Sequence, residues 1–203
     1  MTNRQVGYGC AETVALMLGL RTMTRMTQTN LTNTAVSVAD LFCGKVGEVG
    51  MNIIMSIKPE WCKKIIYGDK TIEVRKTKPE QISVPFKVYV YATFGGENWF
   101  SFGKQKSGHV IGAFTCDRIE RYDIPYPAWQ NDMNPEVKEK SCLSYMQLHR
   151  YAGEQGYVYG WHIREFENWD TPLSIREFID NKGNHFKRPP QSWAYGIRAV
   201  KWE

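Results

Sequence analysis

Several features that would assign this chain to a class at once are missing from its 203 residues. No apolar run approaches the roughly 20 residues that a membrane-spanning helix needs. The five cysteines are far apart and form no C-x-x-C pair, so neither a disulfide framework nor a zinc site is expected. The net charge of +5 is scattered, which permits binding to nucleic acid but does not require it. We therefore expect a cytoplasmic protein with free thiols, no membrane association, no metal and no cofactor.

Aromatic residues are nearly absent from the first fifty positions. Only Tyr8 and Phe42 precede residue 51, and all seven tryptophans follow it. A segment with so few large side chains buries little apolar area to offset its ordering entropy. We expect residues 1–50 to be either a poorly structured extension or the product of a mis-called start, with translation beginning at Met51. Residues 51–203 are expected to form the folded domain.

Beyond residue 51, short strands alternate with a few short helices. Residues 52–57 predict a buried strand, Pro59 and Glu60 favour the start of a helix, and Gly68 favours its end. Further strands are predicted at 70–75, 87–93, 109–116, 157–163 and 192–200, helices at 144–152 and 174–179, and an irregular stretch around Pro125, Pro127 and Pro135. This mixture predicts an α+β fold with a curled sheet or small β-barrel.

The segment from Lys70 to Arg75 combines a strand pattern with charge. Alternation places Ile72 and Val74 on one face, which should point into the core. Glu73 and Arg75 are then neighbours on the opposite face, which we expect to be the wetter one. Lys70 precedes them, at the mouth of the turn after the first helix.

The residues Ser56–Trp61 (SIKPEW) and Gly68–Arg75 (GDKTIEVR) resemble the signature of the ASCH family, in which a strand and a short helix lead to G-x-K-x-x-E-x-R. Phe114–Asp117, Trp161–Ile163 and Lys187–Trp193 are similar to a phage and prophage subgroup of that family. The resemblance covers residues 51–203. It implies a PUA-like curled sheet or small barrel with short flanking helices and a cleft beside the signature. The wider superfamily includes modules that bind RNA or recognise a modified base.

The charged residues of the signature suit recognition of a nucleotide. An arginine offers a planar fork of donors, a lysine adds a second cation, and a glutamate accepts from an exocyclic amine. Our main hypothesis is therefore a regulatory protein that binds RNA or a modified nucleoside. The candidate binding residues are Lys58, Lys70, Glu73, Arg75, Trp99, Arg188 and Gln191. The alternative is that Glu73 and Arg75 form only a surface ion pair.

Two further functions stay open. One ASCH subgroup is an amidohydrolase that deacetylates N4-acetylcytidine with a Lys, a Thr and a Glu. By that resemblance Lys70 would be catalytic, but Glu73 stands where the subgroup has its Thr, and Glu139 corresponds only loosely to its acid. The other possibility is a partner-binding regulatory module without a nucleotide ligand. The sequence carries no signal for a particular oligomeric state.

Three other sets of side chains are interpreted as structural. His162 alternates with Trp161 and should face away from it. Cys62 and Cys116 lie in apolar surroundings and are expected to be buried packing residues. The aromatic series of Tyr157, Tyr159 and Trp161 is more typical of a core than of a platform for stacking bases.

Overall fold

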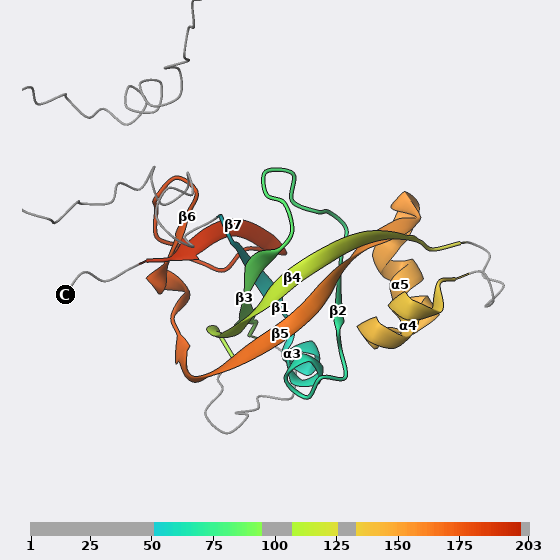
Figure 1. The fold of residues 1–203 in the computed structure, drawn as a ribbon, viewed down its shortest axis with the longest axis horizontal. Helices are drawn as coiled ribbons and strands as arrows, with labels where there is room; N and C mark the ends of the chain where they lie inside the picture. The colour runs from blue at the N-terminus through green and yellow to red at the C-terminus, as the bar shows by residue number, and fades with distance from the viewer. Residues whose placement is uncertain (1–50, 95–106, 126–132, 200–203) are drawn as a thin grey trace, which may run out of the picture. The chain divides into compact units, whose positions relative to one another are not determined.

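The structure is a computed structural model that describes residues 51–94, 107–125 and 133–199 (Figure 1). The predictions for residues 1–50 and for Trp99 lie outside the described residues. In chain order the elements are β1 (Ile53–Ile57), α3 (Pro59–Ile66), β2 (Ile72–Arg75), β3 (Phe86–Ala92), β4 (His109–Asp123), α4 (Pro135–Ser141), α5 (Tyr145–Ala152), η1 (Gly153–Gln155), β5 (Tyr157–Leu173), η2 (Ile175–Glu177), β6 (Phe178–Asp180) and β7 (Trp193–Arg198). No described helix is long and apolar enough to cross a membrane.

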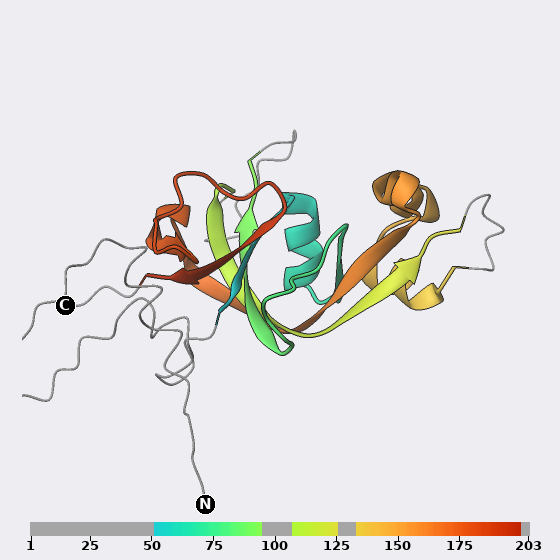
Figure 2. The same cartoon turned by 90° about the horizontal axis from the view of Figure 1, so that it is seen from above.

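The strands form one mixed sheet in the order β2-β5-β4-β3-β1-β7-β6. β1 and β3 run parallel, and every other neighbouring pair is antiparallel. Within the described strands, β2 and β6 are the two edges, so the sheet is curled rather than closed into a barrel. Figure 2 shows α3 on the concave side of the bent sheet. The predicted α+β class with a curled sheet and short flanking helices is confirmed.

Helix boundaries follow the local signals. α3 begins with Pro59 in its first turn and Glu60 beside it, and Gly68 follows the helix with a φ of 81°. α5 begins at a capping box in which Ser144 and Gln147 bond each other's backbone N–H groups. Both helices lie where the sequence predicts them.

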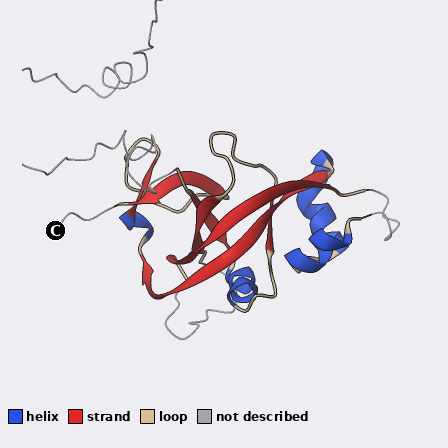
Figure 3. Cartoon of the chain, viewed as in Figure 1, coloured by secondary structure: helices blue, strands red, loops and turns tan. Residues whose placement is uncertain are grey.

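Four elements differ from the prediction. β4 and β5 continue well past residues 116 and 163 as one long antiparallel pair. α4 occupies a stretch predicted to be irregular, where Asn134 caps the helix and Pro135 opens its first turn. Figure 3 shows α4 and α5 together at one end of the β4–β5 pair. The predicted helix at 174–179 is a single 3₁₀ turn, which leads directly into β6.

The buried side chains form three clusters, and two of them bear on the site. The first fills the concave side of the sheet and includes Cys62, Cys116 and Trp161. The second packs α4 and α5 on the other side of β2 and β5 through Ile72, Val74, Tyr122, Val137 and Leu148. Both cysteines are buried, as predicted, and burial raises the pKa of each thiol, that of Cys116 to about 12.

Gly112 in β4 lies where the long strand pair leaves no room for a side chain. A Cβ atom there would collide with the backbone carbonyl oxygen of Glu167 in β5 and with the ring of Phe166. We expect Gly112→Ala to lower the free energy of unfolding by roughly 1–3 kcal/mol, because the backbone of β5 must move. Urea unfolding measures this. Thr115→Ala on the same strand is the control, and equal stability of the two variants would contradict the prediction.

Candidate functional site

Lys70, Glu73 and Arg75 form one group of ion pairs, called the ion cluster here. Lys70 Nζ lies 3.3 Å from Glu73 Oε2, and Arg75 Nη1 lies 3.0 Å from Glu73 Oε1. The three residues are only 2%, 5% and 9% exposed. The prediction that Glu73 and Arg75 face the wetter side of their strand is therefore wrong. Both faces of β2 are covered, one by α4 and α5 and the other by the concave interior.

Lys70 ties β2 to the end of α4. Its ammonium donates to the carbonyl oxygens of Ile72 (2.8 Å) and Ser141 (2.7 Å), and Ser141 is the last residue of α4. The same ammonium lies 5.4 Å from the ring centroid of Trp61 in α3. All of these contacts are inside the fold, so Lys70 does not project into solvent.

Arg75 reaches across the opening of the curled sheet. Its Nη2 donates to the carbonyl oxygen of Ser56 in β1 at 2.7 Å, although β1 and β2 are not neighbours in the sheet. Trp193 Nε1 donates to Thr77 Oγ1 at 3.0 Å across the same boundary.

The Tyr195 hydroxyl also spans this boundary, accepting from the backbone N–H groups of Glu80 and Gln81. We call the boundary between residues 72–81 and strands β1 and β7 the seam. Among the described residues, no hydrogen bond from backbone to backbone crosses it.

Three buried polar atoms at the seam have no hydrogen-bond partner within the described part of the chain: Glu73 Oε2, Arg75 Nε and Trp161 Nε1. Glu73 Oε2 still has the charge of Lys70 beside it. Strand register brings the three residues to one face, because Glu73 lies opposite Trp161 and Arg75 lies two residues further along β2. Burying a polar group without a hydrogen-bond partner costs about 1–3 kcal/mol of folding free energy. Three such groups on one face of a sheet therefore need a physical explanation.

Aromatic rings surround these atoms. The Trp161 ring lies 5.6 Å from that of Trp193 and 5.7 Å from that of Phe86, measured between centroids. Trp193 in turn contacts Tyr195 at 5.5 Å. The seam therefore combines two charges of one sign, one of the other, and planar apolar surfaces.

The remaining predicted residues lie outside the cluster. Lys58, Arg188 and Gln191 are exposed. Lys58 precedes α3, and its carbonyl oxygen accepts from the helix's first N–H groups. Arg188 and Gln191 flank Pro190, whose carbonyl oxygen accepts from Ser56 Oγ at 2.6 Å. Since Ser56 also binds Arg75, this contact brings the 188–191 segment to the seam.

The residues that bear on the amidohydrolase resemblance do not form one catalytic group. Thr71, the threonine nearest to the position where that subgroup has its Thr, binds Lys140 and Ile163 through its backbone groups. Glu139 is exposed on α4. Lys70, as described, is engaged by two carbonyl oxygens and Glu73.

A second group of titratable residues, not anticipated from the sequence, occupies the opposite face of β5. This polar network consists of Arg118, Glu120, Tyr122, Glu136, Lys140 and His162. The Tyr122 hydroxyl donates to Glu120 Oε2 at 2.7 Å and lies 3.1 Å from Glu136 Oε2. No group of three or more His, Cys, Asp or Glu side chains in the described part of the chain is arranged to hold a metal ion.

Burial and charge within the polar network shift the pKa values of three of its members. The Lys140 hydrogen bond, aided by Tyr122, lowers the pKa of Glu136 to about 2. Burial, together with the hydrogen bond to Glu120, raises the pKa of Tyr122 well above its ordinary value. Burial and the Arg118 charge lower the pKa of His162.

The tautomer of His162 follows from its neighbours. Arg118 Nη2 can only donate, so His162 Nδ1, 3.0 Å away, accepts from it. The proton of the neutral ring then lies on Nε2, which faces the Tyr122 hydroxyl at 3.3 Å and Glu120 Oε2 at 3.6 Å. As predicted, His162 points away from the Trp161 side of the strand.

The network had a partial signal in the sequence. Arg118, Glu120 and Tyr122 alternate along β4, but this part of the strand lies past its predicted end. Glu136 and Lys140 are four residues apart on α4, whose Asn134-Pro135 start could have been read as a helix signal.

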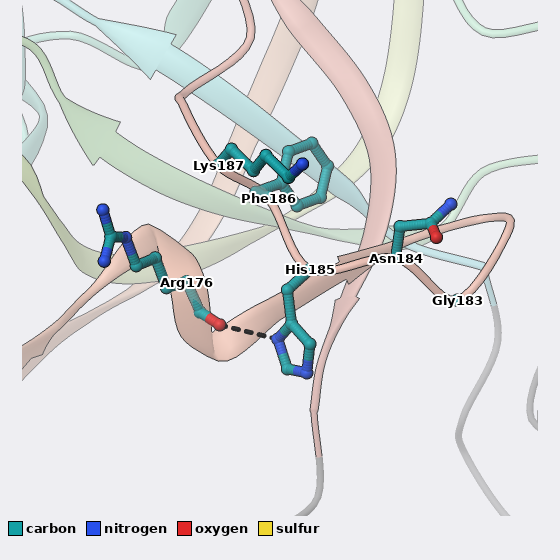
Figure 4. Close-up of a pocket in the computed structure, with 6 residues that line it drawn as sticks. All are labelled: Arg176, Gly183, Asn184, His185, Phe186 and Lys187. Carbon is teal, nitrogen blue, oxygen red and sulfur yellow. Dashed lines mark hydrogen bonds between the residues drawn. The ribbon is translucent and has the colours of Figure 1, made fainter.

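A hollow of about 800 Å³ lies elsewhere, beside β6. Arg176, Gly183, Asn184, His185, Phe186 and Lys187 line it. His185 Nδ1 is bound to the carbonyl oxygen of Arg176 at 2.7 Å. Figure 4 shows that the side chains of Arg176, Asn184 and Lys187 point in different directions. They do not converge on one ligand position, and no predicted site residue lines this hollow.

Comparison with known proteins finds solved structures with a similar fold. No protein-family model matches the chain, and no curated protein matches its sequence. The crystal structure of ASCH from Zymomonas mobilis is 21% identical with a TM-score of 0.49, covering 71% of this chain and 86% of that chain. Structures of two mutants of that protein, one Tyr-to-Phe and one Ser-to-Ala, are 20% identical, with TM-scores of 0.49. They cover 71% of this chain and 88% and 87% of theirs. No residue role carries over at this level, and a phage or prophage origin stays a prediction.

We expect Glu73→Gln to lower the free energy of unfolding by about 3–5 kcal/mol, because Lys70 and Arg75 then stay buried without a counter-charge. Urea unfolding measures the change. Arg164→Gln, which removes an exposed cation next to Asp117 and Glu165, is the control and should cost at most about 1 kcal/mol. Similar losses in both variants would show that the buried cluster gives no particular stability.

The stability of the fold should depend on the titration of His162. The unfolded chain binds a proton on this residue near its ordinary pKa of 6.5, whereas the folded chain keeps the ring neutral to lower pH. Stability is therefore lost as the pH falls below about 6.5. Thermal unfolding between pH 7.5 and 5 should show a falling Tm for the wild type and a flatter profile for His162→Gln. Parallel profiles would refute this assignment.

Proposed function

We propose that this chain binds an RNA base or a modified nucleoside at the seam, next to the ion cluster. The observation that carries the proposal is the set of unpartnered buried atoms on Glu73, Arg75 and Trp161. A ligand that hydrogen-bonds to them would recover the free energy that their burial costs.

A nucleobase has the chemistry that these atoms require. Trp161 Nε1 and Arg75 Nε are N–H donors and suit carbonyl or ring-nitrogen acceptors on a base edge. Glu73 Oε2 is an acceptor and suits an exocyclic amine or a ring N–H. The rings of Trp61, Trp161 and Trp193 supply apolar surfaces of the kind on which bases stack.

Access follows from the way the seam is held. Among the described residues, every hydrogen bond across it involves a side chain, from Arg75, Trp193 or Tyr195. A neutral bond of this kind contributes about 0.5–1.5 kcal/mol, and one from a charged group about 1.5–3 kcal/mol. A ligand can therefore enter by displacing side chains, without breaking a backbone ladder. The exposed Lys58, Arg188 and Gln191, together with Trp99, remain our candidates for contacts to the rest of the ligand.

The test is a titration of the full chain with a panel of natural and modified nucleosides, in which tryptophan fluorescence or calorimetry measures binding. The informative variant is Trp161→Phe, which removes one unpartnered N–H and keeps an aromatic ring. We expect it to weaken binding by roughly 2- to 10-fold, because a lost hydrogen bond is worth about 0.5–1.5 kcal/mol. The smaller ring should also lower the free energy of unfolding, which urea unfolding measures separately. Trp169→Phe on the same strand, but in another core cluster, is the matched control.

The alternatives appear as separate outcomes of this test. Wild-type affinity for none of the nucleosides, or equal affinity in Trp161→Phe, would overturn the proposal. Release of acetate from N4-acetylcytidine that Lys70→Ala abolishes would point to an amidohydrolase instead. A defined protein partner without nucleoside binding would point to a regulatory module.

A further inference from the structure

We infer that the ligand is a single-stranded RNA, whose neighbouring nucleotides lie along the outward continuation of the seam over Tyr159 and Tyr157. This rests on the proposed function of the seam and extends it from a nucleoside to a strand.

Strand register arranges this surface in rows. Ile119 in β4, Trp161 in β5 and Glu73 in β2 form the innermost row. Arg121, Tyr159 and Arg75 form the next, and Asp123 with Tyr157 the outermost. Directly opposed residues share a face, so the indole at the seam and the two phenol rings form one series along β5.

Burial decreases along the series. Trp161 is fully buried, whereas Tyr159 and Tyr157 are partly exposed. Tyr159 packs against the rim of the concave core, and Tyr157 belongs to none of the three core clusters. The expectation that all three aromatics are core thus holds for Trp161 and fails for Tyr157. The rings of Tyr157 and Tyr159 lie 5.7 Å apart at an interplanar angle of 83°.

Cations accompany the rings. The Arg121 guanidinium lies 3.9 Å from the centroid of Tyr157, and Lys78 Nζ lies 5.7 Å from that of Tyr159. Arg121 is paired with Asp123, but both are exposed, so the arginine can exchange this carboxylate for a phosphate at little cost.

Partly exposed rings flanked by exposed cations are what proteins use to bind single strands, with bases stacking and phosphates held by charge. A free nucleoside would need only the seam. A continuous row of ring and charge leading away from it adds sites for neighbouring nucleotides. The bases of a duplex are stacked on each other and cannot use the rings in this way.

The experiment measures binding of a labelled single-stranded RNA of about ten nucleotides to the full chain by fluorescence anisotropy. Tyr157→Leu should weaken binding by roughly 5- to 150-fold, the range for loss of one stacked base, and Tyr157→Phe should restore it. Arg121→Gln should reduce the slope of log affinity against log salt by about 0.7. Phe94→Leu and Arg164→Gln, exposed positions at other places in the fold, are the controls.

A parallel titration with a free nucleoside separates the two proposals. Tyr157→Leu should leave nucleoside affinity unchanged while RNA affinity falls. Unchanged RNA affinity in both Tyr157→Leu and Arg121→Gln, with nucleoside binding intact, overturns the inference that RNA runs over the tyrosines. The proposal that a nucleoside binds at the seam would then still stand. RNA binding that depends on Tyr157 but not on Trp161 supports RNA binding over the tyrosines and overturns the proposal that a base binds at the seam. Equal competition by duplex RNA, or no binding of either ligand, overturns the inference that RNA runs over the tyrosines.

Discussion

The structure depends on how a curled sheet is held where its strands do not pair. Arg75 spans the boundary between β2 and β1 through the carbonyl oxygen of Ser56, while Lys70 fixes the same strand to the end of α4. Glu73 lies between them and balances both charges. Buried ion pairs add little net stability compared with apolar packing of the same volume. The cluster's contribution is therefore geometric: it determines where β2 lies relative to strands that it never pairs with.

That placement makes β2 and β5 a partition between two chemically different regions. On the concave side, Glu73, Arg75 and Trp161 meet aromatic rings with polar atoms left unpartnered. On the other side, α4 and α5 cover Ile72 and Val74, and the polar network satisfies most of its own groups. A satisfied network is rigid and specific, whereas an unsatisfied group favours a ligand. This contrast is why we propose a binding site on the concave side and not on the other.

Local signals in the sequence predict much of this fold but little of the site's environment. The ends of α3 and the cap at Ser144 are set by neighbouring residues, so they could be read directly. The burial of Glu73 and Arg75 could not, because alternation assumes one wet face, and the carbonyl oxygen that Arg75 binds belongs to Ser56 on a strand that β2 does not pair with. The polar network was missed for the same reason: its members come from β4, α4 and β5 and meet only in the folded chain.

The adjacency of Trp161 and His162 in β5 has a consequence for how this strand can vary. Side chains in a strand alternate with a period of two, so inserting or deleting a single residue before this pair would exchange their faces. The His162 imidazole would then enter the apolar interior, and the Trp161 indole would lie among the carboxylates of the polar network. A change in the length of this strand therefore has to be absorbed by a β-bulge, such as those at the register shifts of the β4–β5 pair, whereas a substitution at a single position does not.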